Sequence, residues 1–234
     1  MIAFVIGAFL LLGTIGVGRA GAQAPVDPAP GWPTFTATDP QSPSSDNTPR
    51  ISGNAGSDTT VALCTDDACT VPAVNGTGTG SATGSSFDFT VSGIEVTVPD
   101  DSETTFWGTA TDDEDNVSEC SLSSITYIED SSPPAPPTFT GTDPESPGFD
   151  NWPRIQGEAE PGSRVVLYLD SSCTDPVSDS SASHGEGTAE QFSTDGLMVP
   201  VANDTSETFW ATATDEVGNV SACSSDSIAY EQDT

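Results

Sequence analysis

The stretch "TFWATATDEVGNVSACS", Thr208–Ser224, begins with alternating side chains and ends in a turn followed by a cysteine. In an extended chain Phe209, Ala211 and Ala213 share one face, because successive side chains of a strand point to opposite sides. We expect this face in a hydrophobic core, where the small alanines let two sheets approach, with Trp210 on the outer face or under a loop. The reverse assignment of the two faces is the alternative.

A close variant of this stretch occurs earlier in the chain. "TFWGTATDDEDNVSECS" occupies 105–121, and "PTFTATDPQSPSSDNTPRISGNA" (33–55) aligns without a gap with "PTFTGTDPESPGFDNWPRIQGEA" (137–159), 104 positions later. A period of this size is too long for a solenoid repeat and equals the size of one whole domain. The sequence therefore predicts two copies of one domain.

Within each copy, short runs rich in Val, Ile, Thr and aromatic residues alternate with turn clusters. No stretch shows a sustained helical period. We expect an all-β protein, with two tandem Ig-like Greek-key β-sandwich domains of about seven strands each. In the first copy the expected strands are "TFTAT" (34–38), "RISGNA" (50–55), "TVALCT" (60–65), "FDFTV" (87–91), "IEVTV" (94–98), "TTFWGTAT" (104–111) and "SITYIE" (124–129).

The N-terminus predicts export. An apolar run over 2–17 is followed by "RAGAQA", in which Ala20-Gly21-Ala22 fits a signal-peptidase site. A transmembrane anchor is the alternative, but the run is short for a membrane span. We expect a signal peptide (1–22), a linker (23–32), Ig-like domain 1 (33–128), a Pro-rich linker (129–136) and Ig-like domain 2 (137–234). The mature protein is then secreted or held at the cell surface.

The charge balance limits the partners. The chain has 36 acidic residues against 4 arginines and no lysine, for a net charge of -32. Such a surface repels phosphate backbones and anionic lipids, so we expect no nucleic-acid binding and no membrane insertion after signal cleavage. Cations are the natural small partners, although the same composition also fits an exported protein from a salty habitat.

The five cysteines predict one disulfide per domain. Two cysteines of the first copy align with two of the second, and an exported chain favours their oxidation. Cys64 is the odd one, because Tyr168 takes its place in the second copy. It is a free thiol or pairs locally with Cys69 and leaves Cys120 unpaired. With a single His in the chain, zinc binding is not expected. The aligned pairs are Cys69–Cys120 and Cys173–Cys223.

Several phrases resemble a known family. "TDPESP", "PRI", "V.LY.DSSC" and "TFWATATDEVGNVSACS" are similar to tandem bacterial Ig-like domains of secreted and cell-surface proteins. The resemblance covers nearly all of the mature chain in both copies. It implies stalks, spacers or adhesive units, some of which bind calcium at domain ends. The antibody pattern is not met, because no Trp follows the first Cys at the usual interval.

The acidic phrase after the long strand has two interpretations. In the first it is a turn, in which Asp215 caps the backbone, Gly218 supplies a positive φ, and Asp115 tolerates the same conformation in the first copy. In the second it binds calcium, because Ca²⁺ takes carboxylate and amide oxygens. The predicted calcium ligands are Asp112, Asp115, Asn116, Asp215 and Asn219.

No feature of the sequence favours catalysis. His184 is the only His, lies in a Ser/Gly-rich stretch and has no counterpart in the first copy. We expect a non-catalytic spacer or adhesion protein that requires no cofactor, with an unknown protein or glycan at the cell surface as its partner. The alternative is a calcium-stabilised carbohydrate- or protein-binding module. Trp32, Phe149 and Trp152 lie in loop-like stretches but are too few to name a ligand.

Overall fold

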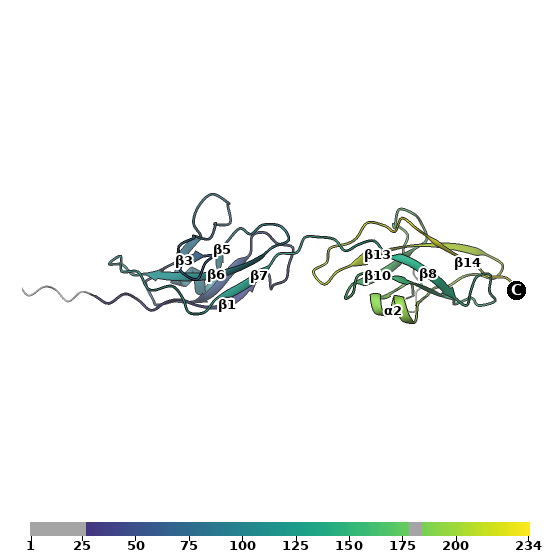
Figure 1. Cartoon of the computed structure of the whole chain (residues 1–234), viewed down its shortest axis with the longest axis horizontal. Helices are drawn as coiled ribbons and strands as arrows, with labels where there is room; N and C mark the ends of the chain where they lie inside the picture. Colours follow the sequence, from purple (N-terminus) through teal and green to yellow (C-terminus); the bar gives the residue numbers. More distant parts are fainter. Residues whose placement is uncertain (1–26, 178–183) are drawn as a thin grey trace, which may run out of the picture.

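The computed structural model describes residues 27–177 and 184–234, and both copies of the repeat form β-sandwich domains. Figure 1 shows the two domains following one another along the long axis of the molecule. The predicted signal peptide, 1–22, lies outside the described residues. Within 27–177 and 184–234 there is no helix of the length and apolar character that a membrane span requires.

Domain 1 contains two antiparallel sheets with the order β1-β2-β5 and β4-β3-β6-β7. The chain crosses between the sheets after β2, β4 and β5, which is the Greek-key connectivity of an Ig/FN3-like sandwich. The predicted count of seven strands is confirmed. The elements are β1 (Thr34–Asp39), β2 (Arg50–Asn54), β3 (Thr60–Cys64), β4 (Thr83–Ser85), α1 (Ser86–Val91), β5 (Ile94–Glu95), β6 (Glu103–Thr111) and β7 (Ile125–Ile128).

Domain 2 repeats this arrangement, with the sheets β12-β9-β8 and β11-β10-β13-β14. Even an irregularity of register is reproduced: β1 and β8 each skip one residue in their pairing with the following strand. The elements are β8 (Thr138–Asp143), β9 (Arg154–Glu158), β10 (Arg164–Tyr168), β11 (Glu186–Thr188), α2 (Ala189–Thr194), β12 (Leu197–Met198), β13 (Ser206–Thr214) and β14 (Ile228–Glu231).

Each core lies between the two sheets of its own domain. In β13 the predicted inner face is confirmed, since Phe209, Ala211 and Ala213 are fully buried. Trp210 is only partly buried on the opposite face. Burial of one aromatic side chain of this size contributes about 2–3 kcal/mol to folding, so the Phe/Ala face is a main source of stability.

The prediction that "FDFTV" forms a strand is wrong, because this segment is the helix α1. The Ser85 hydroxyl accepts from the Asp88 N–H at 3.1 Å, and the Asp88 carboxylate accepts from the Ser85 N–H at 3.3 Å. This capping box satisfies two end groups of the helix and overrides the β propensity of its aromatic residues. Thr188 and Gln191 do the same for α2. The expectation of no helix therefore failed for two six-residue segments.

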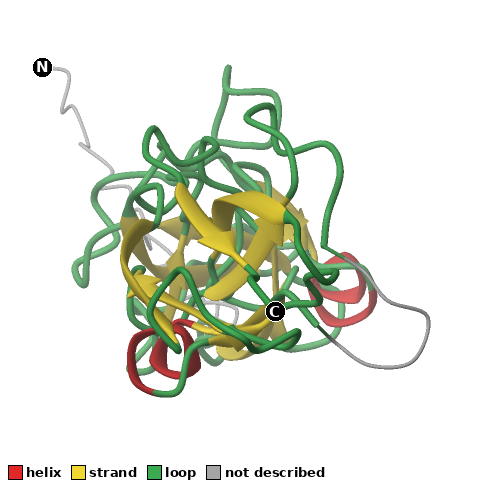
Figure 2. Ribbon diagram, turned by 90° about the vertical axis from the view of Figure 1, so that its right-hand side faces the viewer, coloured by secondary structure: helices red, strands yellow, loops and turns green. Residues whose placement is uncertain are grey.

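Each helix buries one phenylalanine under the three-stranded sheet. Phe89 of α1 packs edge-to-face on Phe35 with the ring centroids 5.7 Å apart, and Phe192 of α2 packs in the same way. A Cβ at Gly53 would lie 2.5 Å from the Phe89 ring, so this glycine makes room for the helix. In Figure 2 both helices lie at the outside of the central strands.

Two smaller differences surround the helices. The strand expected over 94–98 is reduced to Ile94–Glu95, and Val96 makes only an isolated bridge with Asn75. The short strand β4, Thr83–Ser85, was not predicted because its residues lie in a Gly/Ser/Thr-rich stretch without alternation. Between these two short strands the chain passes from one sheet to the other through the capped helix α1.

Candidate functional site

The repeated acidic phrase forms a turn after the longest strand of each domain. In domain 2 one oxygen of Asp215 accepts the backbone N–H groups of Val217, Gly218 and Asn219 at 2.8–3.0 Å. Gly218 has a φ of 98°, which favours glycine. Desolvation raises the pKa of the Asp215 carboxyl, but the hydrogen bonds from Asn219 and the backbone outweigh it and lower the pKa below its usual value.

Domain 1 builds the same turn with different residues. Asp112 accepts the backbone N–H groups of Glu114 and Asn116, and Asp115 adopts a φ of 65° at the position of Gly218. The Asn116 side chain donates to the second oxygen of Asp112 at 3.0 Å. One turn thus contains the predicted site residues Asp112, Asp115 and Asn116. In it the Asp112 carboxylate accepts backbone N–H groups.

The turn of domain 2 also contacts the segment that connects the domains. The Asn219 side-chain amide donates to the Asp130 carbonyl at 2.9 Å and to the Ser132 carbonyl at 3.5 Å. It also donates to the second oxygen of Asp215 at 2.9 Å, which fixes its orientation. The repeated phrase therefore lies where the incoming chain enters its domain, and in domain 2 it holds that chain.

The other end of the connecting segment is bound to domain 1. The Glu129 side chain is buried, and one of its oxygens accepts the Asp101 backbone N–H. The Asp101 carboxylate accepts the Ser131 N–H at 3.1 Å and the Ser132 hydroxyl at 2.7 Å, and the latter bond is the main reason that the pKa of Asp101 is lowered. Contacts with domain 1 therefore continue to Ser132, and those with domain 2 begin at Asp130.

The carboxylates near the predicted calcium ligands differ between the domains. In domain 1 the carboxylates of Asp27, Asp112 and Glu114 lie within 4.8 Å of one another, and Asp115 is not a member of this group. The Asn116 amide borders the group through its hydrogen bond to Asp112. Around Asp215 and Asn219 the described residues contain no group of three such carboxylates. Calcium binding stays a prediction, with Asp27 and Glu114 as candidate ligands that sequence reasoning missed. Asp27 is distant in sequence, and only the fold brings it to the turn.

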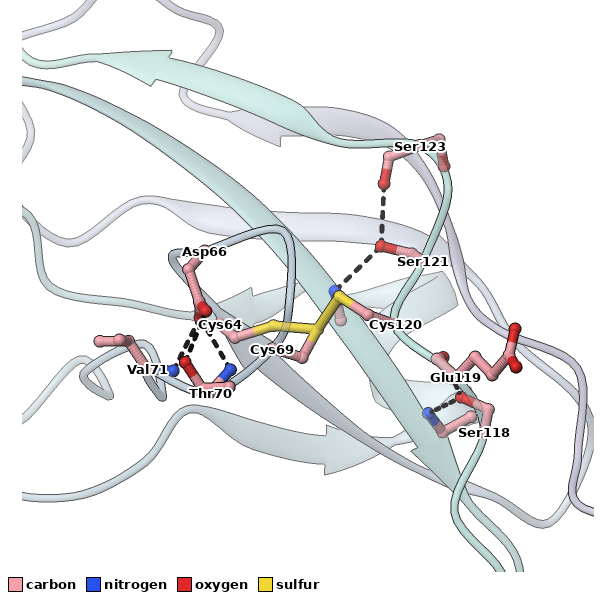
Figure 3. Close-up of a disulfide and its surroundings, with 12 residues drawn as sticks. Cys64, Asp66, Cys69, Thr70, Val71, Ser118, Glu119, Cys120, Ser121 and Ser123 are labelled. Carbon is pink, nitrogen blue, oxygen red and sulfur yellow. Dashed lines mark hydrogen bonds between the residues drawn. A yellow bond between two sulfur atoms is a disulfide. The ribbon is translucent and has the colours of Figure 1, made fainter.

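The structure joins Cys173 to Cys223, which lie 50 residues apart in sequence. In domain 1 the Cys69 sulfur contacts the sulfurs of both Cys64 and Cys120, and Figure 3 shows it between them. A sulfur atom forms only one disulfide, so these two contacts are alternatives. The predicted pair Cys69–Cys120 and the local pair Cys64–Cys69 are both sterically available.

The exposed aromatic residues are scattered. Trp152 lies against His184 with ring centroids 4.8 Å apart and ring planes tilted by 49°, and 44% of the Trp152 surface is exposed. Phe149 is 79% exposed nearby in sequence, and Trp32 precedes domain 1. His184 thus lies against an aromatic ring.

The strand order, the buried inner faces and the bound connecting segment define a class: a tandem pair of Ig/FN3-like β-sandwich domains. This confirms the expected resemblance at the level of the fold. No protein family matches the chain, and no curated protein does.

Three solved structures show some likeness to this chain. A biofilm-associated protein BSP domain is 18% identical over 86% of this chain and 29% of that one, with a TM-score of 0.26. Chicken CNTN1 FN1–FN3 domains are 9% identical over 89% and 68%, with a TM-score of 0.37. Domains 7, 8 and 9 of the S-layer protein SbsC are 11% identical over 87% and 60%, with a TM-score of 0.27. The chain thus covers less than a third of the first of these solved chains. The assignment to the class rests on the strand order and the cores described above.

Proposed function

We propose that this protein is a non-catalytic spacer and adhesion module of the extracellular surface. Its two sandwiches are held in line by a connecting segment that is bound at both ends. A spacer must keep its two ends far apart. A flexible linker would instead let the two domains fold back on each other. The strongly acidic, lysine-free surface keeps such a spacer from anionic membranes and nucleic acids.

The observation that carries this proposal is the contact of Asn219 with the carbonyls of Asp130 and Ser132. The segment between the domains also contains "PPAPP" (133–137), and proline-rich segments are extended and semi-rigid. Prolines limit bending within the segment, while Asn219 fixes the angle at which it meets domain 2. Together they support a joint that favours one relative orientation.

The test is small-angle X-ray scattering of the full mature chain and of two matched variants. Asn219→Ala removes the amide that holds the connecting segment, whereas Asn116→Ala removes the equivalent amide of domain 1, which lies away from that segment. We expect an extended, narrow distance distribution for the wild type and Asn116→Ala, and a broader, shorter one for Asn219→Ala. Three identical, broad distributions would contradict the proposed joint.

A calcium-stabilised binding module is the second candidate. It is favoured by the carboxylates of Asp27, Asp112 and Glu114, which converge where the chain enters domain 1. Calcium takes six to eight oxygen ligands, and three carboxylates offer up to six. Thermal melting with calcium, magnesium or a chelator at constant ionic strength tests this candidate. A rise in melting temperature with calcium alone, lost in Asp27→Ala, would support it, and coincident curves would exclude it.

A further inference from the structure

Domain 1 contains three cysteines that meet at one point. Cys64 ends β3 and is 3% exposed, Cys69 lies in the following turn, and Cys120 lies in the loop after β6. All three sulfurs lie within 4.8 Å of one another. The Cα–Cα distances of 5.2 Å (Cys64–Cys69) and 5.6 Å (Cys69–Cys120) both fall in the range that disulfides adopt.

From this geometry we infer that domain 1 carries a disulfide-exchange site, in which Cys69 alternates between Cys64 and Cys120 and the displaced thiol forms a mixed disulfide with a disulfide-bearing partner. Only one of the two bonds exists at a time, so the oxidised domain always holds one thiol beside one disulfide. No backbone rearrangement is needed for the exchange, because the central sulfur already lies between the other two (Figure 3).

The exchange is balanced without an external oxidant. The Cys64 thiolate attacks the Cys69 sulfur, the Cys64–Cys69 bond forms, the Cys69–Cys120 bond breaks, and Cys120 leaves as a thiolate that takes up the proton. In a second step the Cys120 thiolate attacks a sulfur of the partner's disulfide and expels one partner thiol. The result is a covalent link between Cys120 and the partner.

The position of Cys69 is fixed by a rigid turn. The Asp66 carboxylate accepts the backbone N–H groups of Thr70 and Val71 at 2.9 and 2.7 Å and the Thr70 hydroxyl at 2.7 Å. These bonds hold Cys69 at a φ of 52°. The hydroxyl of Thr70 is the main cause of the lowered pKa of Asp66, so the carboxylate keeps this turn at neutral pH.

Exchange moves the thiol from the core toward the surface. When Cys69 is bonded to Cys120, the remaining thiol is on the buried Cys64. When Cys69 is bonded to Cys64, the thiol is on Cys120, which is only partly buried in its loop. A thiol that large reagents do not reach is thereby converted into one that they do. While the thiol is on Cys64 it is protected by burial. A partner that reacts with the Cys120 thiol shifts the exchange equilibrium toward the Cys64–Cys69 disulfide.

Domain 2 supplies the internal control. Its Cys173 has the same φ of 52°, and Asp170 holds its turn through Thr174 and Asp175 as Asp66 does in domain 1. Tyr168 occupies the position of Cys64 in the strand register, so a third sulfur is missing there. The same turn and disulfide position therefore exist in domain 1 with a third cysteine and in domain 2 without one.

The experiment uses the full oxidised chain and two trapping conditions. Acid quenching, followed by unfolding and labelling with a maleimide, locates the thiol by peptide mass mapping, because exchange requires the thiolate. Native reaction at mildly alkaline pH with the aromatic disulfide DTNB locates the thiol that a disulfide partner captures. We expect the acid trap to find the thiol on both Cys64 and Cys120, and DTNB to place one equivalent per chain on Cys120.

Two variants sharpen the result. Cys64→Ser should abolish the reaction with DTNB, and Tyr168→Cys should create the same reaction at Cys223. A thiol found at one position only in the acid trap, or a DTNB adduct on Cys64, would overturn the inference. If Tyr168→Cys fails to fold, the wild type and Cys64→Ser still decide between exchange and a static disulfide.

Discussion

Domains 1 and 2 share one strand order, one set of registers and one pair of capped helices, yet they differ at a few well-defined positions. Cys64 faces the Cys69 sulfur where domain 2 has Tyr168. Buried Glu129 stands where domain 2 has Gln232, and the positive-φ turn position holds an aspartate in one domain and a glycine in the other. The sandwich is thus specified by its core and turns, and these positions vary without a change of fold.

Domain 1 has three chemical features that domain 2 lacks. Domain 1 has a third sulfur, a buried carboxylate with one oxygen that lacks a hydrogen-bond partner among the described residues, and a cluster of three acids. At the corresponding positions domain 2 replaces these features with a tyrosine, a neutral amide and a glycine-containing turn. Domain 2 is therefore a reference against which each feature of domain 1 is measured.

The largest expected effect concerns the disulfides. Cys173→Ala opens a loop with a sequence separation of 50, which should cost about 4 kcal/mol of unfolding free energy in domain 2. Cys120→Ala should cost domain 1 only about 2 kcal/mol, because Cys64–Cys69 then closes a short loop instead. Hydrogen exchange of the central strand amides, followed separately in each domain, measures both values. Equal losses would show that Cys64 does not replace Cys120.

The second prediction concerns the turn of domain 2. Asp215→Ala removes the acceptor for three backbone N–H groups and should destabilise domain 2 by about 1–2 kcal/mol at neutral pH. Because the pKa of Asp215 is depressed in the folded state, its contribution is present above the unfolded value of 3.8 and is lost as the pH falls through the folded pKa.

This prediction is checked by melting the wild type and the variant from neutral pH down to about pH 2. The difference in melting temperature should shrink toward zero in acid. Asp112→Ala in domain 1 is the matched control and should have a smaller effect, because Asp112 accepts two backbone N–H groups rather than three. A pH-independent difference would mean that the Asp215 carboxylate does not act through its charge.

The third prediction exchanges the buried acid and amide. Glu129→Gln should stabilise domain 1 by about 1 kcal/mol, because a buried carboxylate oxygen without a donor is replaced by an amide that can donate. In domain 2 the Gln232 amide donates to the Phe149 carbonyl at 3.4 Å, and Gln232→Glu should destabilise that domain by a similar amount. Denaturant titration of both swaps measures the shifts. Stabilisation by both would contradict the argument.

The smallest expected effect is at the turn apex. Asp115→Gly should stabilise domain 1 by a few tenths of a kcal/mol, since glycine adopts a positive φ without the strain of a Cβ. Gly218→Asp should weaken domain 2 by a similar amount. Melting temperatures at matched ionic strength measure both, and a loss of stability in Asp115→Gly would indicate that the Asp115 side chain has a partner in solution.

Sequence patterns predicted the repeat, the sandwich class and the buried face of β13, because these depend on alternation and on self-similarity. They failed at "FDFTV", where two side-chain bonds of a capping box outweighed the β propensity of two phenylalanines. The turn at Asp215 was also predictable, since an aspartate ahead of a glycine is a local signal. What the Asn219 amide binds was not, because its acceptors lie 87 and 89 residues away in sequence.

The sequence by itself determined the number of domains, their strand periodicity and the alignment of two cysteines in each, since all of these are properties of neighbouring or repeated residues. Only the tertiary structure showed which sulfurs meet, because three cysteines allow more than one pairing and the fold brings the Cys69 sulfur to those of both Cys64 and Cys120. It also decided that the acidic phrase of domain 2 holds the incoming chain. A hydrogen bond to a remote carbonyl leaves no pattern in the sequence, and it exists only once the sheets have brought both groups together.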